Sequence, residues 1–293
     1  MKYRIRHITE YQYADRVSHC YNLAHIVPRT SLRQTCERSQ INVAPHPAFT
    51  SRREDYFGNQ AFHFEIQRPH DKLTITSESD VEVFAQRGAL NLDFGISCRE
   101  ARQLLLDSKD EETLLAREFV LDSPMVKANQ ALLEYAKPSF ADERPLLSAV
   151  ASLTKRIFDE FTYSPEATTI ATPLTEVLAT KKGVCQDFAH LQIGCLRALG
   201  IPAKYVSGYI ETLPPPGQEK MVGSDASHAW VSVYSPLEGW LEFDPTNNQI
   251  CSDQHIITAW GRDYFDVTPL KGVIFGGGKK PILSVSVDVA RLG

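Results

Sequence analysis

The alternation of hydrophobic and polar positions changes near residue 100. Before it, short runs alternate apolar and polar side chains with a period of two, at residues 3–8, 61–66, 73–76 and 81–84. This period is typical of half-buried strands, and breakers between the runs, such as Phe57-Gly58-Asn59, are typical of turns. We therefore expect the first hundred residues to form an antiparallel, sandwich-like β module.

From about residue 110 to 200 the apolar spacing becomes helical. Proline is favoured at the first position of a helix, so three prolines predict helix starts. The predicted helices run from Ser123-Pro124 to before Pro138, from Pro145 through Ile157, and from Thr172-Pro173 through Leu178. A last helix is expected to begin near Cys185 and to end at Gly200-Ile201-Pro202, because glycine followed by proline stops a helix.

After residue 200 the period returns to two. Strands are predicted at 203–210, 227–234, 240–244 and 282–289, with a surface loop over 213–225 that borders His228. Helices followed by antiparallel strands predict an α+β fold for the second half. The length of 293 residues suffices for two domains, and we expect a β-rich domain at 1–105 and a helix-and-sheet core at 106–293.

Composition excludes several classes of protein. A hydrophobic fraction of 43% with 23% charged residues is ordinary for a folded soluble protein. No stretch of about 18 residues is free of charge, so a membrane span is not expected. The start, Met1 to Arg6, lacks the apolar segment of a secretion signal, so export is not expected and the predicted location is cytoplasmic. A net charge of -5 gives no basic field for nucleic acid. The six cysteines form no C-x-x-C pair and no zinc-like spacing with histidine, which predicts free thiols and no metal or other cofactor.

Cys185 is the first candidate for chemistry. A cysteine at the start of a helix lies beside unpaired backbone N–H groups and the positive end of the helix dipole, which favour its thiolate. The same N–H groups can hold an oxyanion, and Gly183 leaves room for a substrate carbonyl to approach. The alternative is that Cys185 is a small buried side chain without chemistry.

A catalytic cysteine also needs a base and a group that orients the base. His228 and Trp230 share one face of a predicted strand, and Asp244 lies on the corresponding face of the next. If Tyr234 pairs with Trp240 in a hairpin, His228 lies diagonally opposite Asp244, within reach of its carboxylate. A histidine bound to a carbonyl and an aspartate that starts a turn are the alternatives.

Four segments together resemble the bacterial transglutaminase-like superfamily, and the resemblance is strong from about residue 110 to 275. The first hundred residues resemble the β-rich region that precedes this core in bacterial members. The resemblance implies a papain/transglutaminase-like core in which Cys185 is the nucleophile, His228 the general base and acid, and Asp244 the group that orients the imidazole. The segments are Gly183-Val184-Cys185-Gln186-Asp187-Phe188, Leu199-Gly200-Ile201-Pro202-Ala203, His228-Ala229-Trp230 and Phe243-Asp244-Pro245-Thr246-Asn247.

The function predicted from these residues is thiol-dependent acyl transfer on a peptide or protein substrate. Hydrolysis of a peptide or amide bond is favoured, because no acidic loop resembles a calcium site. Glutamine-dependent cross-linking and a non-catalytic binding module on the same fold stay open, whereas a zinc hydrolase lacks a ligand cluster in the sequence.

Three further features carry structural interpretations. Tyr163 could donate to an oxyanion, but a core tyrosine is the favoured interpretation. His190, five residues beyond Cys185 in the same predicted helix, is expected to be packed or exposed without chemistry. Gly261-Arg262-Asp263-Tyr264 with Asp266 is expected to form a buried ion pair.

Overall fold

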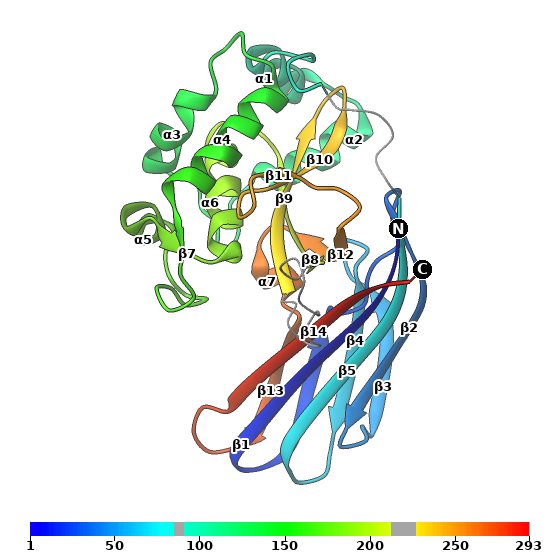
Figure 1. Ribbon diagram of the computed structural model, residues 1–293. Helices are drawn as coiled ribbons and strands as arrows, with labels where there is room; N and C mark the ends of the chain where they lie inside the picture. The colour runs from blue at the N-terminus through cyan, green and yellow to red at the C-terminus, as the bar shows by residue number, and fades with distance from the viewer. Residues whose placement is uncertain (85–90, 212–226, 293) are drawn as a thin grey trace, which may run out of the picture.

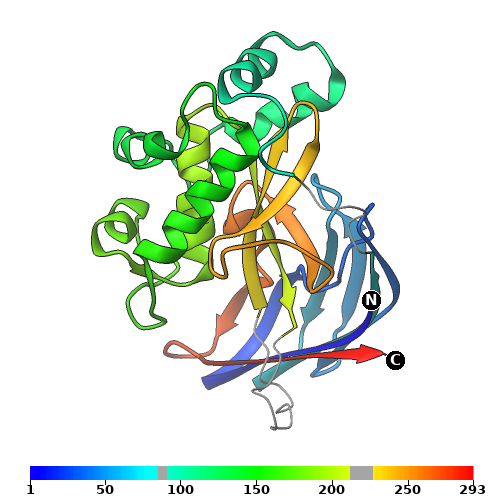
Figure 2. The ribbon, with the colours of Figure 1, turned by 45° about the horizontal axis from the view of Figure 1, so that its top comes forward.

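The computed structural model describes residues 1–84, 91–211 and 227–292. Two antiparallel sheets and a layer of helices make up this part of the chain, and the second sheet lies between the helices and the first sheet (Figures 1 and 2).

The first sheet is organised around one long strand, β1 (Lys2–Ala24). The first half of β1 pairs with β5 and β14, and the last residues of β1 pair with β4 and β13. The pairing with β5 is irregular between Gln12 and Val17, where the strand passes from one half to the other. Side chains of both halves, among them Tyr13, Phe64 and Ile75, pack in one buried cluster, as a sandwich-like module requires. The other strands of this sheet are β2 (Gln34–Ala44), β3 (Phe49–Glu54), β4 (Gln60–Ile66), β5 (His70–Val83), β13 (Leu270–Gly276) and β14 (Ile282–Leu292).

The two C-terminal strands belong to this first sheet. Lys2 of β1 pairs with Leu292 of β14, which brings the two ends of the chain side by side (Figure 1). The sequence predicted a strand at 282–289 but grouped it with the second half, because alternation shows that a strand forms and not which strand it joins. Residues 270–292 therefore lie in the sheet of the N-terminal region, although the predicted division at 105 and 106 counts them with the core.

The second sheet carries the hairpin predicted from the sequence. Its strand order is β11-β10-β9-β8-β12, all antiparallel, and three of its strands lie where the period of two predicted them. The fourth long strand, β12, was not predicted. The bounds are β8 (Ala203–Ile210), β9 (Ser227–Ser235), β10 (Gly239–Asp244), β11 (Gln249–Ile250) and β12 (His255–Gly261).

Helices cover the face of the second sheet opposite the β module. Two predicted starts hold: Pro145 and Pro173 immediately precede their helices. The start at Ser123-Pro124 is wrong, because the Ser123 hydroxyl accepts a hydrogen bond from buried Arg197 and the Asn129 side chain caps the helix instead. The helices are α1 (Cys98–Asp107), α2 (Glu111–Ala116), α3 (Gln130–Ala136), α4 (Leu146–Glu160), α5 (Leu174–Thr180), α6 (Cys185–Ala198) and α7 (Tyr264–Val267), with 3-10 turns at Arg117–Val120 and Lys137–Ser139 and a small parallel pair of β6 (Thr162–Tyr163) and β7 (Lys182–Gly183).

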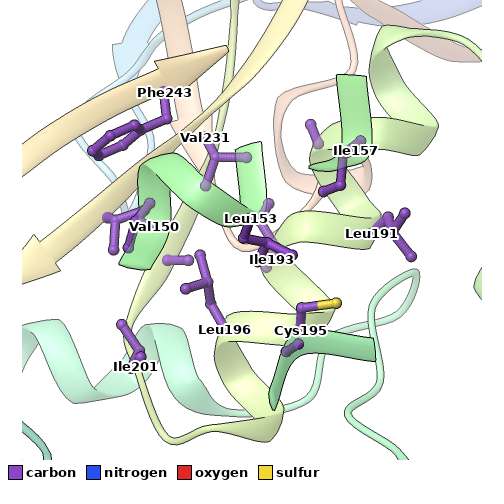
Figure 3. Close-up of a cluster of buried hydrophobic side chains, with 14 of the residues drawn as sticks. Val150, Leu153, Ile157, Leu191, Ile193, Cys195, Leu196, Ile201, Val231 and Phe243 are labelled. Atoms are coloured by element: carbon purple, nitrogen blue, oxygen red, sulfur yellow. The ribbon is translucent and has the colours of Figure 1, made fainter. Parts of the chain in front are cut away.

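Helix α6 is the centre of the main hydrophobic core. It lies between α4 and the hairpin, and Figure 3 shows Leu191, Ile193 and Leu196 of α6 among side chains of both. Val231 and Phe243 supply the apolar face of the hairpin, as predicted. A helix buried on this many sides cannot shift without opening the core, so its N-terminal residue, Cys185, is held fixed against the sheet.

The predicted surface loop at 213–225 lies outside the described residues. Within the described ranges, the helices are too short or too polar to cross a membrane.

Candidate active site

Cys185 is the first residue of α6, as predicted, and its side chain is partly exposed. The helix start is fixed by Asp187, whose carboxylate accepts from the Val184 backbone N–H at 2.9 Å and from the Thr168 hydroxyl at 2.6 Å. A Cβ at Gly183 would lie 2.8 Å from the Asp187 carboxylate, so the glycine makes room for this contact, and the approach of a substrate carbonyl stays a prediction. The first turn of α6 thus directs its unpaired backbone N–H groups toward the site of Cys185.

The hairpin of β9 and β10 has the predicted register. Tyr234 pairs with Trp240, and Val231 pairs with Phe243, which puts His228 and Asp244 on the same face of neighbouring strands. The His228 Nε2 atom lies 2.7 Å from Asp244 Oδ2. Both side chains are buried, with 9% of His228 and 0% of Asp244 exposed, so water screens this pair little.

The imidazole of His228 interacts with Cys185 as well as with Asp244. Burial alone would lower the pKa of His228, but hydrogen bonds and charge attraction from Asp244 and Cys185 raise it to about 10. Since Nε2 is bound to the carboxylate, Nδ1 is the nitrogen that remains for the thiol. The carboxylate is thus hydrogen-bonded to the imidazole, and the thiol at the helix start lies near enough to raise the pKa of that imidazole.

Five donors surround the carboxylate of Asp244. Oδ1 accepts from the backbone N–H groups of Thr246 at 2.9 Å and Asn247 at 3.2 Å, an arrangement typical of a turn-starting aspartate. Oδ2 accepts from His228, from Asn247 Nδ2 at 2.7 Å and from His255 Nε2 at 3.3 Å. Burial favours the protonated acid, but these hydrogen bonds and the charge of His228 lower the pKa of Asp244 below its ordinary value. The turn predicted as an alternative to catalysis is thus the device that holds the carboxylate in place.

The indole of Trp230 packs beside the imidazole of His228. A Cβ at Gly208 would lie 2.5 Å from the Trp230 ring and 2.1 Å from the Ile256 carbonyl oxygen, so only glycine lets this indole lie against β8. The Trp230 Nε1–H donates to Glu242 at 2.9 Å, and the indole meets the His255 ring edge to face at 5.2 Å. The indole therefore restricts how far either imidazole can turn.

Sequence reasoning missed His255. It lies at the start of β12, is 2% exposed, and brings its ring to the carboxylate of Asp244 from the strand at the opposite edge of the sheet. A signal was present, because residues 256–260 are a β-type run of Ile, Ile, Thr, Ala and Trp. No sequence pattern, however, indicates that β12 pairs with β8 and so reaches the site.

Tyr163 is not a core tyrosine, which corrects the favoured interpretation. It is 53% exposed, and its strand pairs with β7 so that Tyr163 lies beside Gly183, directly before the Cys185 helix. Burial raises the pKa of Tyr163, and the nearby Cys185 charge raises it further. The hydroxyl thus lies in the electrostatic field of the thiol.

The remaining predicted residues have structural positions. His190 is packed, as expected: burial lowers its pKa to about 4, and its Nε2 accepts from the Tyr264 backbone N–H at 3.1 Å. Arg262 pairs with Asp266 at 2.9 Å, whereas Asp263 is fully buried and accepts from the backbone N–H groups of Met125 and Phe265. These contacts link α7 to the rest of the core and do not reach Cys185.

One group of side chains has the composition of a metal site. The ligand atoms of His228, Asp244 and His255 lie within 4.8 Å of one another, a cluster that the sequence did not reveal. The Nε2 atoms of His228 and His255, however, both form hydrogen bonds with the same oxygen of Asp244, so hydrogen bonding accounts for the arrangement. The six cysteines are all free thiols, as predicted.

The arrangement contains the groups that acyl transfer requires. A thiol at a helix start can become a nucleophile, an imidazole in contact with it can move its proton, and a carboxylate can hold the imidazole in one orientation. The backbone N–H groups of the first turn of α6 can stabilise negative charge on a carbonyl oxygen.

Two family models match the chain. Residues 3–82 match the bacterial transglutaminase-like N-terminal region, and residues 134–245 match the transglutaminase-like superfamily. The second match includes Cys185, His228 and Asp244.

Several relatives and solved structures are similar to the chain. An uncharacterised protein of Mycobacterium tuberculosis is 43% identical over 98% of this chain and 92% of its own length. A protein-glutamine gamma-glutamyltransferase of Pseudomonas aeruginosa is 34% identical over 44% of this chain and 21% of its own length. The crystal structure of a candidate cysteine protease from Cytophaga hutchinsonii covers 100% of this chain and 91% of that one, with a TM-score of 0.77 and 22% identity, a likeness of fold.

Proposed function

The chain belongs to the transglutaminase-like superfamily, and from this premise we propose that it is a thiol-dependent acyl-transfer enzyme that hydrolyses peptide or amide bonds. One observation carries the proposal: His228 lies 2.7 Å from Asp244 through its Nε2, and the Cys185 thiol is near enough to raise the pKa of the same imidazole. A histidine with a purely structural role would not need both partners, one of them at the start of a buried helix.

In the proposed mechanism Cys185 attacks the carbonyl carbon of the scissile bond. The thiol proton passes to Nδ1 of His228 before the attack, as the raised pKa of the imidazole favours, and the sulfur then forms a bond to the carbon while the carbonyl oxygen takes the negative charge. The Cys185 backbone N–H stabilises this oxyanion, since the first N–H groups of a helix have no partner within the helix. His228 then gives its proton to the departing amine or ammonia, which leaves a thioester on Cys185.

Water completes the reaction in the hydrolytic form. His228 removes a proton from water, the hydroxide attacks the thioester, and the acid product leaves while the thiol recovers its proton. Asp244 keeps its negative charge throughout and stabilises the imidazolium that forms twice in the cycle. Because Cys185 is partly exposed, water can reach the thioester, which supports hydrolysis.

A lysine amine is the second possible acceptor. The 34% identity to a protein-glutamine gamma-glutamyltransferase over 44% of this chain favours this alternative, in which the thioester of a glutamine side chain is resolved by an amine. Both reactions use the same residues up to the thioester. They differ only in whether water or an amine reaches it first.

A peptide assay separates these reactions. Gln-containing peptides are incubated with the protein in the presence of a fluorescent primary amine, and new N-termini, ammonia and amine incorporation are measured. Hydrolysis predicts new N-termini or ammonia without incorporation, whereas cross-linking predicts incorporation in proportion to ammonia. Cys185→Ala is the matched control and should abolish either signal. Absence of all three signals across a broad peptide library would favour a non-catalytic binding module instead.

The substrate class and location are also part of the proposal. We propose a peptide or protein substrate, on the grounds of the acyl-transfer site, and a cytoplasmic location, which the six free thiols support because free thiols persist in a reducing compartment. Fractionation of cells that produce the protein tests the location.

A further inference from the structure

His255 lies outside the predicted set of catalytic residues but contacts it directly. Its ring is 2% exposed, and its Nε2 lies 3.3 Å from Asp244 Oδ2, the same oxygen that binds His228. The three side chains come from β9, β10 and β12, three different strands of the second sheet.

The hydrogen bonds of His255 determine where its proton is. The Ser252 backbone N–H donates to His255 Nδ1 at 3.3 Å, so Nδ1 carries a lone pair and not a proton. A neutral imidazole with an unprotonated Nδ1 carries its proton on Nε2. Since the ionised carboxylate can only accept, Nε2–H of His255 donates to Asp244 Oδ2.

From this geometry we propose that His255 is a positioning residue of the active site, whose Nε2–H holds the Asp244 oxygen that in turn orients His228 for proton transfer with Cys185. This proposal rests on the function proposed above. His255 does not touch the reacting atoms and acts only through the carboxylate.

The surroundings of His255 leave its ring little freedom. The Trp230 indole meets it edge to face at 5.2 Å, and the β12–β8 pairing fixes its backbone opposite Ile210. A donor with a fixed direction favours one position of the carboxylate oxygen, and this position is also 2.7 Å from His228 Nε2. Without the donor, the partners that Oδ2 keeps among the described residues are His228 and Asn247.

The hydrogen bond from His255 also weakens the electrostatic effect of Asp244 on His228. A hydrogen bond from a neutral N–H makes a carboxylate a weaker proton acceptor, so Asp244 stabilises the His228 imidazolium less than it would without this donor. The titratable groups that face this network from the packed elements are Cys185 on α6, the buried thiol of Cys251 and Glu242, which is turned toward Trp230 and Arg33. Within the part of the chain that the structure describes, none of these groups has a hydrogen bond to Oδ2, whose partners are His228, Asn247 and His255.

Two substitutions of His255 test the positioning role. His255→Phe keeps the ring volume and removes the donor, and His255→Gln places an amide N–H near the position of Nε2. On a peptide that the wild type hydrolyses, we expect kcat of the Phe variant to fall about tenfold or more with KM changed less than about twofold. We also expect the alkaline limb of the pH profile of kcat to move upward by about 0.5 to 1 pH unit in the Phe variant. The Gln variant should recover most of the wild-type kcat and most of the wild-type pH profile.

His7→Phe is the matched control. His7 is a buried histidine of the β module that bonds to Tyr209 and Thr9 and does not contact Asp244. It should lower the melting temperature without moving the alkaline limb. If His255→Phe behaves like His7→Phe, or if Gln does not rescue it, His255 has only a structural role and the proposal is overturned.

A measurement on the wild type keeps the proposal testable should the Phe variant not fold. Nitrogen NMR of the histidine rings, assigned with His255→Gln, should show His255 neutral with its proton on Nε2 at neutral pH. A proton on Nδ1 would overturn the positioning role whether or not the protein is an enzyme. A wild type without acyl-transfer activity would instead refute the proposed function and, with it, the catalytic meaning of His255.

Discussion

The Nε2 atom of His228 lies 2.7 Å from Oδ2 of Asp244, across the hairpin of β9 and β10. The two residues are 16 positions apart in the chain, and the register of the hairpin alone brings them together. Asp244 can only accept in this contact, so His228 presents Nε2–H to it and Nδ1 to Cys185. The orientation of the imidazole is therefore set by the carboxylate.

Asp244→Asn tests this orientation. The amide has the size of the carboxylate but can turn an N–H toward Nε2, which would force the ring proton to Nδ1 and block acceptance of the thiol proton. We expect kcat to fall about 10³- to 10⁴-fold with the fold retained, as for the same change in serine enzymes. Hydrolysis rates with circular dichroism as the control for folding check this outcome, and a loss below about tenfold would contradict it.

Much of this site could be predicted because its geometry follows from local rules. Proline, glycine and helical spacing locate the start of α6 at Cys185, and a period of two on either side of a short turn fixes the register of the hairpin. His255 could not be predicted, because its contact depends on β12 joining β8, and strand partners are not encoded in alternation. Tyr163 was misjudged for a related reason, since its exposure depends on the pairing of β6 with β7.

The charge on His228 should make stability depend on pH. Its folded pKa is raised from 6.5 to about 10, so it contributes stability that is fully present below about pH 6.5 and is lost as pH rises toward 10. Urea unfolding of Cys185→Ala and of Cys185→Ala/His228→Gln measures the part of this contribution that comes from Asp244, because both proteins lack the thiol that also raises the pKa of His228. We expect the difference between the two proteins to shrink by at least about 1.4 kcal/mol, the value of one pKa unit, between pH 6 and 10. A difference that is constant over this range would show that Asp244 does not hold a charged imidazole.

Gly208→Ala should be strongly destabilising. The added methyl group would lie 2.1 Å from the Ile256 carbonyl oxygen and 2.5 Å from the Trp230 ring, and the carbonyl cannot move without breaking the pairing of β12 with β8. We expect a loss of about 3 kcal/mol or more in the free energy of unfolding.

Gly194→Ala is the control for that change. A Cβ added at Gly194 would lie 2.8 Å from the Leu132 Cδ1 atom, which is the end of a flexible side chain. Alanine is also favoured over glycine inside a helix. Urea unfolding of both variants should give a much smaller loss for Gly194→Ala. Equal losses would mean that Trp230 and β12 tolerate displacement, which would weaken the account of how His228 is held.

Alkylation should distinguish Cys185 from Cys36, the other partly exposed cysteine. Burial raises the pKa of Cys36, whereas Cys185 lies at a helix start and contacts His228. At pH 6 we expect iodoacetamide to modify Cys185 at least about tenfold faster than Cys36, with the advantage lost in His228→Gln. Peptide mass spectrometry gives both rates from one sample. Similar rates for the two thiols would identify Cys185 as a cysteine without chemistry.

For the fold as for the site, elements set by local sequence patterns could be predicted, whereas pairings between distant segments could not. Strand β4, parts of β1 and β5, helices α4 to α6 and the hairpin follow from spacing, proline and glycine. The placement of β14 beside β1 does not, because the two strands lie at opposite ends of the chain. The error at Ser123 has a tertiary cause too: buried Arg197 takes the hydroxyl that would otherwise cap a helix.

The central claim is that Cys185 carries the acyl group during the reaction. Rapid acid quenching of the protein with a hydrolysed peptide, followed by mass spectrometry of its fragments, tests this claim most directly. The account predicts an acyl adduct on Cys185 that neutral hydroxylamine removes, that is absent from Cys185→Ala and that forms far more slowly in His228→Gln. An adduct on another residue, or turnover by Cys185→Ala at the wild-type rate, would contradict it.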